Sequence, residues 1–158
     1  TPLRALPAAF RAMTKPFSLQ TVLELMQVRS DEATLQLARL IASERDAKTK
    51  LDLLRNYRDD YAHRFRNAAQ NGIGQREWHN FQEFLNRLDE AIELQAQAVA
   101  QHERHTALGQ RNWQEQRKKL RAFDTLAERH ARSEAQREQK SEQKQQDEIA
   151  ARRRREDS

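Results

Sequence analysis

The sequence predicts an all-α protein: a long antiparallel two-helix coiled-coil hairpin with a polar, helical or disordered C-terminal overhang. Three observations lead to this fold class. Ala, Glu, Lys, Leu and Arg make up 83 of the 158 residues, a composition typical of long helices and coiled coils. Leu, Ile, Val and Phe together number only 30, which is too few for a thick globular core. Apolar residues recur every 3.5 residues on both sides of one glycine-containing break.

Residues 1–17 are predicted to be a flexible lead-in to the first helix. All three prolines of the chain, Pro2, Pro7 and Pro16, fall within it. A proline inside a helix removes one backbone hydrogen bond, and its ring clashes with the preceding turn. Ser18 follows, and its hydroxyl can accept hydrogen bonds from the free N–H groups of a first helical turn. The first helix is therefore predicted to begin at residue 18.

The first predicted helix spans residues 18–70. From Leu19 to Ala68, positions that alternate by four and three residues are apolar in twelve of fifteen cases. An apolar repeat of this period and length is typical of a helix that supercoils around a partner helix. Residues 71–74, with the sequence Asn-Gly-Ile-Gly, then interrupt the repeat. Glycine and asparagine accept the backbone conformations of a tight turn, so we predict a hairpin turn there.

The second predicted helix spans residues 75–145. The apolar repeat resumes at Trp78 and continues to Ala127, with ten of fifteen positions apolar. Residues 128–158 carry nine basic and eight acidic side chains and no apolar stripe. We therefore expect a solvated helix to about residue 145 and a disordered charged tail at 146–158.

The two apolar repeats are mirror images about the turn. Each seam position of the first helix pairs with one of the second so that the two residue numbers sum to 146. Reversing a helix exchanges the order of its three- and four-residue spacings, so this phase is the one that an antiparallel hairpin needs. The predicted coiled-coil seam includes Leu23, Leu37, Leu51, Phe65, Trp78, Phe81, Leu85, Ile92, Trp113 and Leu120.

Facing residues in the seam are predicted to match in size. Trp113 should face Ala33, and Gly109 should face Leu37. In both layers a large side chain meets a small one, which favours close packing.

Polar seam residues are expected to find polar partners where the register supplies one. Ser30 should face Gln116, and the two could satisfy each other. Arg58 faces Leu88 and is expected to point outward into solvent, because leucine offers no acceptor.

The composition argues against catalysis and cofactor binding. No cysteine is present, which excludes disulfides, thiolate metal sites and cysteine nucleophiles. The three glycines do not form a phosphate-binding loop, and His102 and His105 lack the i, i+4 spacing that suits a helical metal site. A two-helix rod also offers no enclosed pocket for a tuned acid and base. We therefore expect a protein that is not an enzyme and takes no cofactor, metal or small-molecule substrate.

The chain is also expected to lack a transmembrane helix, because no apolar run approaches the ~18 residues that span a bilayer. Four consecutive arginines occupy positions 152–155. A solvated charged tail is the plainer interpretation of this run, because no aromatic residues interleave with it to stack on bases. A basic tether for nucleic acid is the alternative.

Aromatic residues crowd on both sides of the predicted turn. Four of them occupy seam positions, but Tyr57 and Phe84 lie off the seam, where a two-helix hairpin cannot cover them fully. Exposed aromatics of this kind are typical of a protein-binding patch, and simple packing against the helix flank is the alternative. The six aromatics are Tyr57, Tyr61, Phe65, Trp78, Phe81 and Phe84.

A further set of residues between about positions 50 and 127 has a familiar spacing. The set comprises Tyr57, Tyr61, Asn71, Gly72, Ile73, Trp78, Asn80, Phe84, Leu88, Ala91, Ile92, Trp113, Leu120, Ala122, Thr125 and Leu126. Its pattern resembles the FliJ family of flagellar type III export proteins. The resemblance implies a cytoplasmic two-helix coiled coil similar to the central stalk subunit of rotary ATPases.

The resemblance also implies three kinds of partner. A protein of this family would insert into the ring of the export ATPase FliI and activate it, contact the export gate protein FlhA, and escort export chaperones. It would associate peripherally with the inner membrane at the flagellar export apparatus. The family would also make Met13 the natural start, with residues 1–12 as an upstream extension.

The resemblance further implies which residues contact the export gate. Lys50 and Gln95 depart from the family pattern, in which glutamine and histidine are usual at these positions. The matching positions are Leu54, Tyr57, Tyr61, Phe84, Leu88 and Ala91.

Two other functions fit the same fold. The stalk protein of a virulence type III secretion system would share the hairpin and differ in its partners. A generic coiled-coil scaffold or chaperone would form oligomers and leave every ATPase unaffected.

Overall fold

The computed structural model describes the backbone of residues 8–158 and the side chains of residues 19–158. It contains two helices, α1 over Ala8–Gln70 and α2 over Gln75–Glu156, and the described residues include no strand. The predicted all-α fold class is confirmed. The chain divides into two units, one of residues 31–114 and one that joins the residues up to 30 with residues 115–158.

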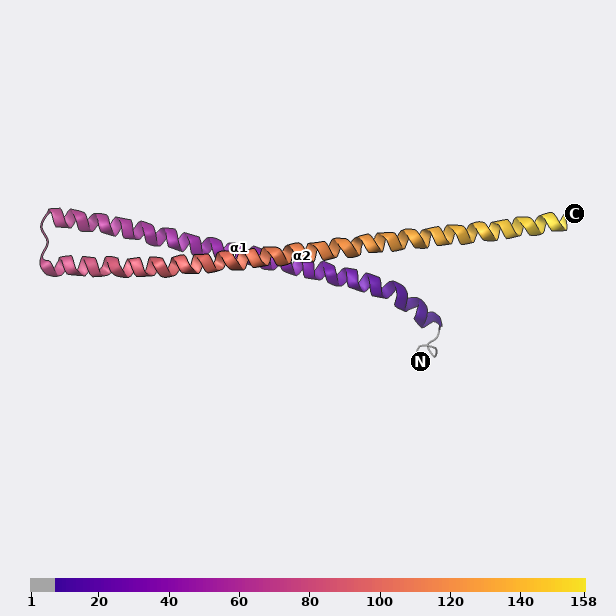
Figure 1. Ribbon diagram of the computed structural model, residues 1–158, viewed down its shortest axis with the longest axis horizontal. Coiled ribbons are helices and arrows are strands. Elements are labelled where there is room, and N and C mark those ends of the chain that lie inside the picture. Colours follow the sequence, from indigo (N-terminus) through magenta and orange to yellow (C-terminus); the bar gives the residue numbers. More distant parts are fainter. Residues whose placement is uncertain (1–7) are drawn as a thin grey trace. The chain divides into compact units, whose positions relative to one another are not determined.

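Residues 31–114 form an antiparallel hairpin in which α1 and α2 run alongside each other away from the turn (Figure 1). Gly72 has a φ of 83°, in the left-handed region that favours glycine. Its N–H donates to the Ala69 carbonyl at 3.3 Å and closes the end of α1. The N–H of Trp78 donates to the Gly74 carbonyl at 3.0 Å and opens α2. Backbone hydrogen bonds therefore shape both sides of the turn.

Burial along this hairpin follows the 3.5-residue repeat. Ala47, Leu51 and Val99 form a buried cluster, against which Ile92 and Ala96 pack. With one exception, every predicted seam position from 33 to 113 is buried or half-buried. The two-helix coiled-coil hairpin predicted from the sequence is thus confirmed, with a core one layer of side chains thick.

Trp78 is the exception, since its side chain is 45% exposed. It lies in the first turn of α2, where its ring centroid is 6.4 Å from that of Phe65. The hairpin ends at this layer, so no further seam residue covers the outer side of the indole.

At Gly109 a small residue meets a large one across the seam. A Cβ added at Gly109 would lie 2.5 Å from Leu40 Cδ1 and 3.7 Å from Leu37 Cδ1, so Leu40 approaches this glycine more closely than the predicted Leu37. Trp113 is half-buried, and its indole N–H donates to Thr34 Oγ1 at 3.0 Å. The glycine therefore permits a close approach of the two helices.

The expectation that Arg58 has no polar partner is wrong. Its Nε donates to Asp89 Oδ1 at 2.8 Å across the hairpin. Asp89 is the residue next to Leu88, so a rotation of the long arginine side chain is enough to reach it. The hydrogen bond and the charge of Asp89 raise the pKa of Arg58 above its usual value.

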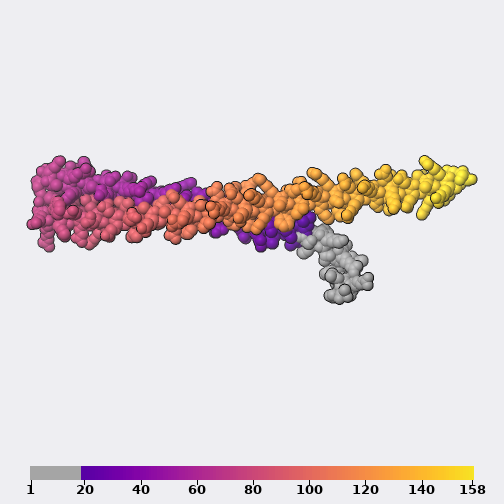
Figure 2. Space-filling view, viewed as in Figure 1, coloured from indigo at the N-terminus to yellow at the C-terminus, as the bar shows by residue number. Residues whose placement is uncertain are grey.

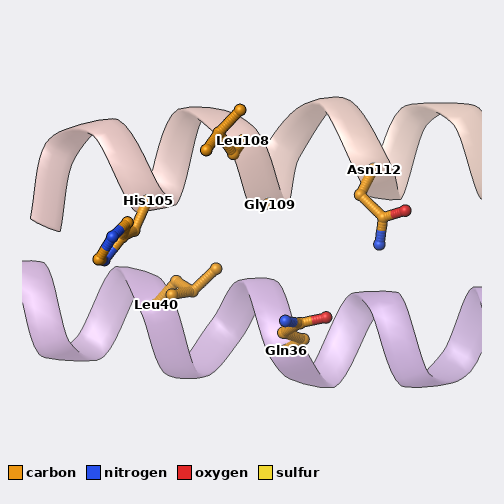
Figure 3. A pocket seen from close by; sticks show the side chains of 6 residues that line it. All are labelled: Gln36, Leu40, His105, Leu108, Gly109 and Asn112. Atoms are coloured by element: carbon orange, nitrogen blue, oxygen red, sulfur yellow. The ribbon is translucent and has the colours of Figure 1, made fainter.

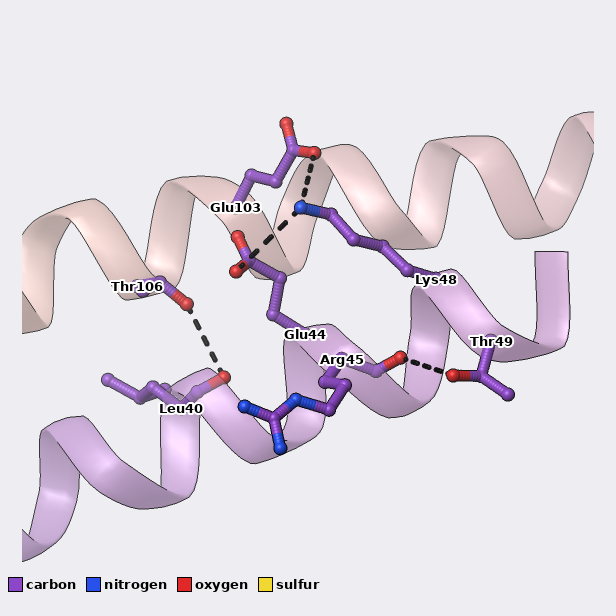
Figure 4. Close-up of polar contacts among 7 residues, drawn as sticks. All are labelled: Leu40, Glu44, Arg45, Lys48, Thr49, Glu103 and Thr106. Carbon is purple, nitrogen blue, oxygen red and sulfur yellow. Dashed lines mark hydrogen bonds and ion pairs between the residues drawn. The ribbon is translucent and has the colours of Figure 1, made fainter. Parts of the chain in front are cut away.

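Other polar contacts also join the helices of the hairpin (Figure 4). Lys48 Nζ lies 3.6 Å from Glu103 Oε1 on α2 and 4.0 Å from Glu44 Oε2 on its own helix. The Thr106 hydroxyl donates to the Leu40 carbonyl at 3.4 Å. These contacts are partly exposed, so they add register and orientation more than stability.

The second unit has a shorter seam. Met26 and Ser30 of α1 are buried, and Leu23 is half-buried. On α2, Leu120 is half-buried, and Gln116 Oε1 is buried with no hydrogen-bond partner among the described residues. The predicted polar match at the Gln116 layer is therefore incomplete.

The overhang of α2 differs from the prediction. Every side chain from 128 to 158 is exposed, and Figure 2 shows that segment uncovered on the face drawn. The helix nevertheless continues to Glu156, so the predicted end at 145 and the disordered tail at 146–158 are wrong. No glycine or proline follows Gly109, so no residue of low helix propensity interrupts α2. Three arginines in the last turn stabilise the helix further, because positive charge is favourable at its C-terminal end.

The start of α1 differs as well. The helix begins at Ala8 and passes through Pro16, so the predicted start at residue 18 is wrong. A proline removes one helical hydrogen bond, but the residues before and after it can still be helical. The rest of the predicted lead-in, with Pro2 and Pro7, lies outside the described residues.

Candidate protein-interaction surface

Aromatic rings from both helices gather near the turn. The ring centroids of Tyr61 and Phe84 are 4.4 Å apart, and Phe81 lies 5.2 Å from Tyr61 and 5.3 Å from Phe65. Tyr57 meets Phe84 edge-on, with centroids 6.3 Å apart and an interplanar angle of 79°. Tilted and edge-to-face rings at these distances attract each other beyond their area burial. The rings therefore form one continuous cluster across the two helices.

All five of these rings keep some exposed area, and three of them come from the off-seam pair and its nearest neighbour. Tyr57 is 51% exposed, while Tyr61 and Phe84 are half-buried. We call Tyr57, Tyr61 and Phe84 the aromatic patch. The 3.5-residue repeat places Tyr57 and Phe84 beside the seam, so α1 and α2 bury one edge of each ring and leave the other outside. A partner could bury this area without unfolding the hairpin.

The other residues of the implied gate-contact set differ in accessibility. Leu54 and Ala91 are half-buried beside the patch, and Leu88 is only 8% exposed. The structure thus brings together Tyr57, Tyr61 and Phe84 on the surface and places Leu88 within the hairpin core. Leu88 can support the shape of the patch but offers little area of its own.

The two positions that depart from the family pattern also differ from each other. Lys50 is exposed, whereas Gln95 is half-buried and its Nε2 donates to the Ala47 carbonyl at 3.0 Å. Gln95 therefore binds α1, and its amide does not point freely at a partner.

Sequence reasoning missed the bonds that cross the hairpin beside the seam. Arg58 pairs with Asp89, and Trp113 with Thr34. Each pair joins a seam residue to the residue that follows its facing seam position, so the two residue numbers sum to 147, one more than the seam constant. A search for polar pairs at that sum would have found both.

The described residues provide no obvious centre for metal chemistry, because no three His, Asp or Glu side chains among them are grouped as ligands. His102 and His105 lie with ring centroids 6.4 Å apart and at nearly right angles. Among the helices as described, none has an apolar stretch long and uncharged enough to cross a membrane.

Comparison with known proteins points to one family. The family model described as "Flagellar FliJ protein" matches residues 14–157. A curated protein of Salmonella typhi, named "Flagellar FliJ protein", is 28% identical over 81 residues. That match covers 51% of this chain and 55% of the relative, so the chain spans about half the length of the curated relative.

Proposed function

Because the chain belongs to the FliJ family of flagellar proteins, we propose that it acts as a non-catalytic stalk and docking protein of the flagellar type III export apparatus. In this role it binds the export gate protein FlhA through the aromatic patch. It also inserts into the ring of the export ATPase FliI, activates it, and escorts export chaperones. Its place is the cytoplasmic side of the inner membrane, where it associates peripherally with the export apparatus.

The observation that carries the gate contact is the aromatic patch. Tyr57 exposes half of its side chain, and its ring is held against Phe84. A ring that is fixed before binding loses little entropy when a partner covers it, and buried tyrosines often dominate binding energy. The patch also coincides with positions at which the sequence resembles the gate-contacting surface of the family.

The ATPase contact is assigned to the other part of the chain. The overhang of α2 beyond Ala127 is helical to Glu156 and exposed throughout, and residues 128–158 carry nine basic and eight acidic side chains. A straight charged helix of this kind can enter a ring lined by complementary charge without first folding. In this proposal the chain couples the ATPase to the gate by binding both, and neither interaction requires a catalytic group.

The gate contact is tested with one exposed residue. Tyr57→Ala should weaken binding to purified FlhA by about tenfold or more, as truncation of a central aromatic does in other interfaces. The matched control is Ile41→Ala, which removes a 40% exposed apolar side chain from the same helix outside the patch. Binding is measured by titration calorimetry, with circular dichroism to confirm equal helix content. Equal affinities for the two variants would refute the gate contact.

The ATPase contact has its own test. The rate of ATP hydrolysis by FliI is followed while the chain is titrated in, and ring assembly is checked by electron microscopy. We expect a saturable rise that Tyr57→Ala leaves intact. No rise at concentrations where the two proteins associate would refute the stalk role and favour a coiled-coil scaffold. Activation of a virulence ATPase in place of FliI would favour the stalk of a virulence system.

A further inference from the structure

A shallow groove lies across the hairpin, well away from the aromatic patch. It has a volume of about 300 Å³ and is lined from both helices (Figure 3). Gly109 forms part of its wall, and Leu40 Cδ1 lies close against it, in the space that a side chain at position 109 would need. The other lining residues are Gln36, His105, Leu108 and Asn112. None of them is an acid, so the groove combines apolar carbon with neutral or basic polar groups.

Leu108 separates this groove from a second one. The second groove, of about 260 Å³, is lined by Arg104, Ala107, Leu108 and Arg111. Leu108 is 60% exposed, although it is a large apolar residue. An exposed leucine with a depression on each side is the shape of a knob and two neighbouring holes in helix packing. A third helix could therefore place apolar side chains, three or four residues apart, on either side of it.

The charged residues that line the second groove are both basic. Arg104 and Arg111 flank the leucine at i−4 and i+3, so all three share one face of α2. Both arginines are exposed, and neither makes an ion pair with any residue that the structure describes. The nearby acid Glu103 is already paired with Lys48. Glu115, four residues after Arg111, forms no ion pair with it either, so the groove offers two guanidinium groups that no described carboxylate pairs with.

We propose that the two grooves beside Leu108 form a docking site for an acidic amphipathic helix of a partner protein. The apolar ridge of that helix packs around Leu108. Its flanking glutamate or aspartate side chains accept hydrogen bonds from Arg104 and Arg111, whose planar guanidinium groups suit carboxylates. This contact is separate from the proposed gate contact, and either one can fail alone.

The charges also argue against a second copy of the same chain as the occupant. In a symmetric pair the same patch faces itself, so arginines on either side of Leu108 would meet arginines of the other copy. Like charges placed opposite each other across an interface are unfavourable. An acidic partner removes this repulsion and supplies the missing carboxylates.

The test uses the full chain and a displayed library of helical peptides. Apolar positions of the peptides are fixed at i, i+4, i+7 and i+11, and the flanking positions are randomised among Glu, Lys, Gln and Ser. We expect glutamate to be enriched over lysine by about fivefold or more, because glutamate pairs with Arg104 and Arg111 whereas lysine is repelled by them. The best peptide is then synthesised, and its affinity is measured by fluorescence anisotropy.

Two variants and one control give the test its resolution. Leu108→Ala should weaken the selected peptide about tenfold, since it removes the knob. The double variant Arg104→Glu, Arg111→Glu should lose the glutamate-flanked peptide and bind its lysine-flanked counterpart. The control Arg129→Glu, Arg132→Glu makes the same charge change on exposed residues of α2 and should leave binding unchanged.

Several results would overturn the proposal. One is that no peptide is enriched, and another is that lysine is enriched over glutamate. A third is that the control reduces binding as much as the Arg104 and Arg111 variant does. Sedimentation of the chain alone completes the set: a dimer that Leu108→Ala dissociates would assign the site to a second copy. Loss of FlhA binding has no bearing on these readouts, so failure of the gate contact is distinguishable.

Discussion

Substitution of leucine at two nearby positions of α1 tests the packing of the hairpin directly. Leu51 is 7% exposed and lies in the buried cluster with Val99, whereas Leu53 is 63% exposed. Leucine to alanine removes three carbons, worth ~0.8 kcal/mol each when fully buried, or ~2.4 kcal/mol in all. Scaled by the buried fraction, the loss is ~2.2 kcal/mol for Leu51→Ala and ~0.9 kcal/mol for Leu53→Ala.

Two smaller effects widen the difference. A cavity left beside Val99 adds to the cost of Leu51→Ala, although a core one layer thick can partly collapse into it. The higher helix propensity of alanine offsets part of the cost of Leu53→Ala. We therefore expect a loss of about 2–3 kcal/mol in the free energy of unfolding for Leu51→Ala and below ~1 kcal/mol for Leu53→Ala.

The assay is urea denaturation followed by helix ellipticity at 222 nm, with both variants compared at equal concentration. The two proteins have the same composition and differ only in which leucine is lost, so each controls for the other. The reasoning is refuted if Leu53→Ala costs as much as Leu51→Ala. That result would place position 53 in the interface and shift the helix register.

Three further predictions concern the turn, the ion pair and the overhang. Gly72→Ala should lower the free energy of unfolding by about 1–2 kcal/mol, because the φ of 83° is strained for alanine. The control Gly74→Ala should change it by less than about 1 kcal/mol, because no atom lies near the added Cβ. Equal urea midpoints for the two variants would contradict this. A double-mutant cycle with alanine at Arg58 and Asp89 should give a coupling energy of about 0.3–1 kcal/mol that falls in high salt, since the side chains are 37% and 50% exposed. A larger coupling energy that does not change with salt would show that the pair is buried. Deletion of residues 128–158 should reduce the ellipticity at 222 nm but leave the urea midpoint of the hairpin unchanged, because every side chain in the deleted segment is exposed. A clear drop in that midpoint would show that the segment packs on the hairpin.

The aromatic patch illustrates how far sequence reasoning reaches toward a site. The spacing alone showed that Tyr57 and Phe84 lie off the seam, and the structure leaves Tyr57 half exposed with its ring against Phe84. The same spacing places Leu88 in the seam, and the structure buries it, although the family resemblance implies Leu88 in the contact surface. That difference arises because a seam residue and a flanking residue can match a family pattern equally well, while only one of them is available to a partner. Whether the patch binds the gate stays a prediction.

The helix ends show a different limit. Proline at position 16 predicts a helix that begins at residue 18, and the lack of an apolar stripe after Ala127 predicts an end near residue 145, yet α1 begins at Ala8 and α2 ends at Glu156. A boundary depends on the sum of many small propensities along the chain, so one unfavourable residue or an uncovered face does not decide it. The turn is easier to anticipate, because glycine at position 72 meets a specific backbone requirement.

By itself the sequence determined that this protein is a helical hairpin, that its apolar repeat runs along both helices, and where the chain turns. It could do so because, in a regular helix, the direction of each side chain follows from its position along the chain. A 3.5-residue apolar repeat therefore shows which face of each helix meets the other. Tertiary structure alone decided the pairing of Arg58 with Asp89, the close approach of Leu40 to Gly109 and the two grooves beside Leu108. These features depend on the separation of the two helices and on side-chain rotamers, which packing sets and periodicity leaves open.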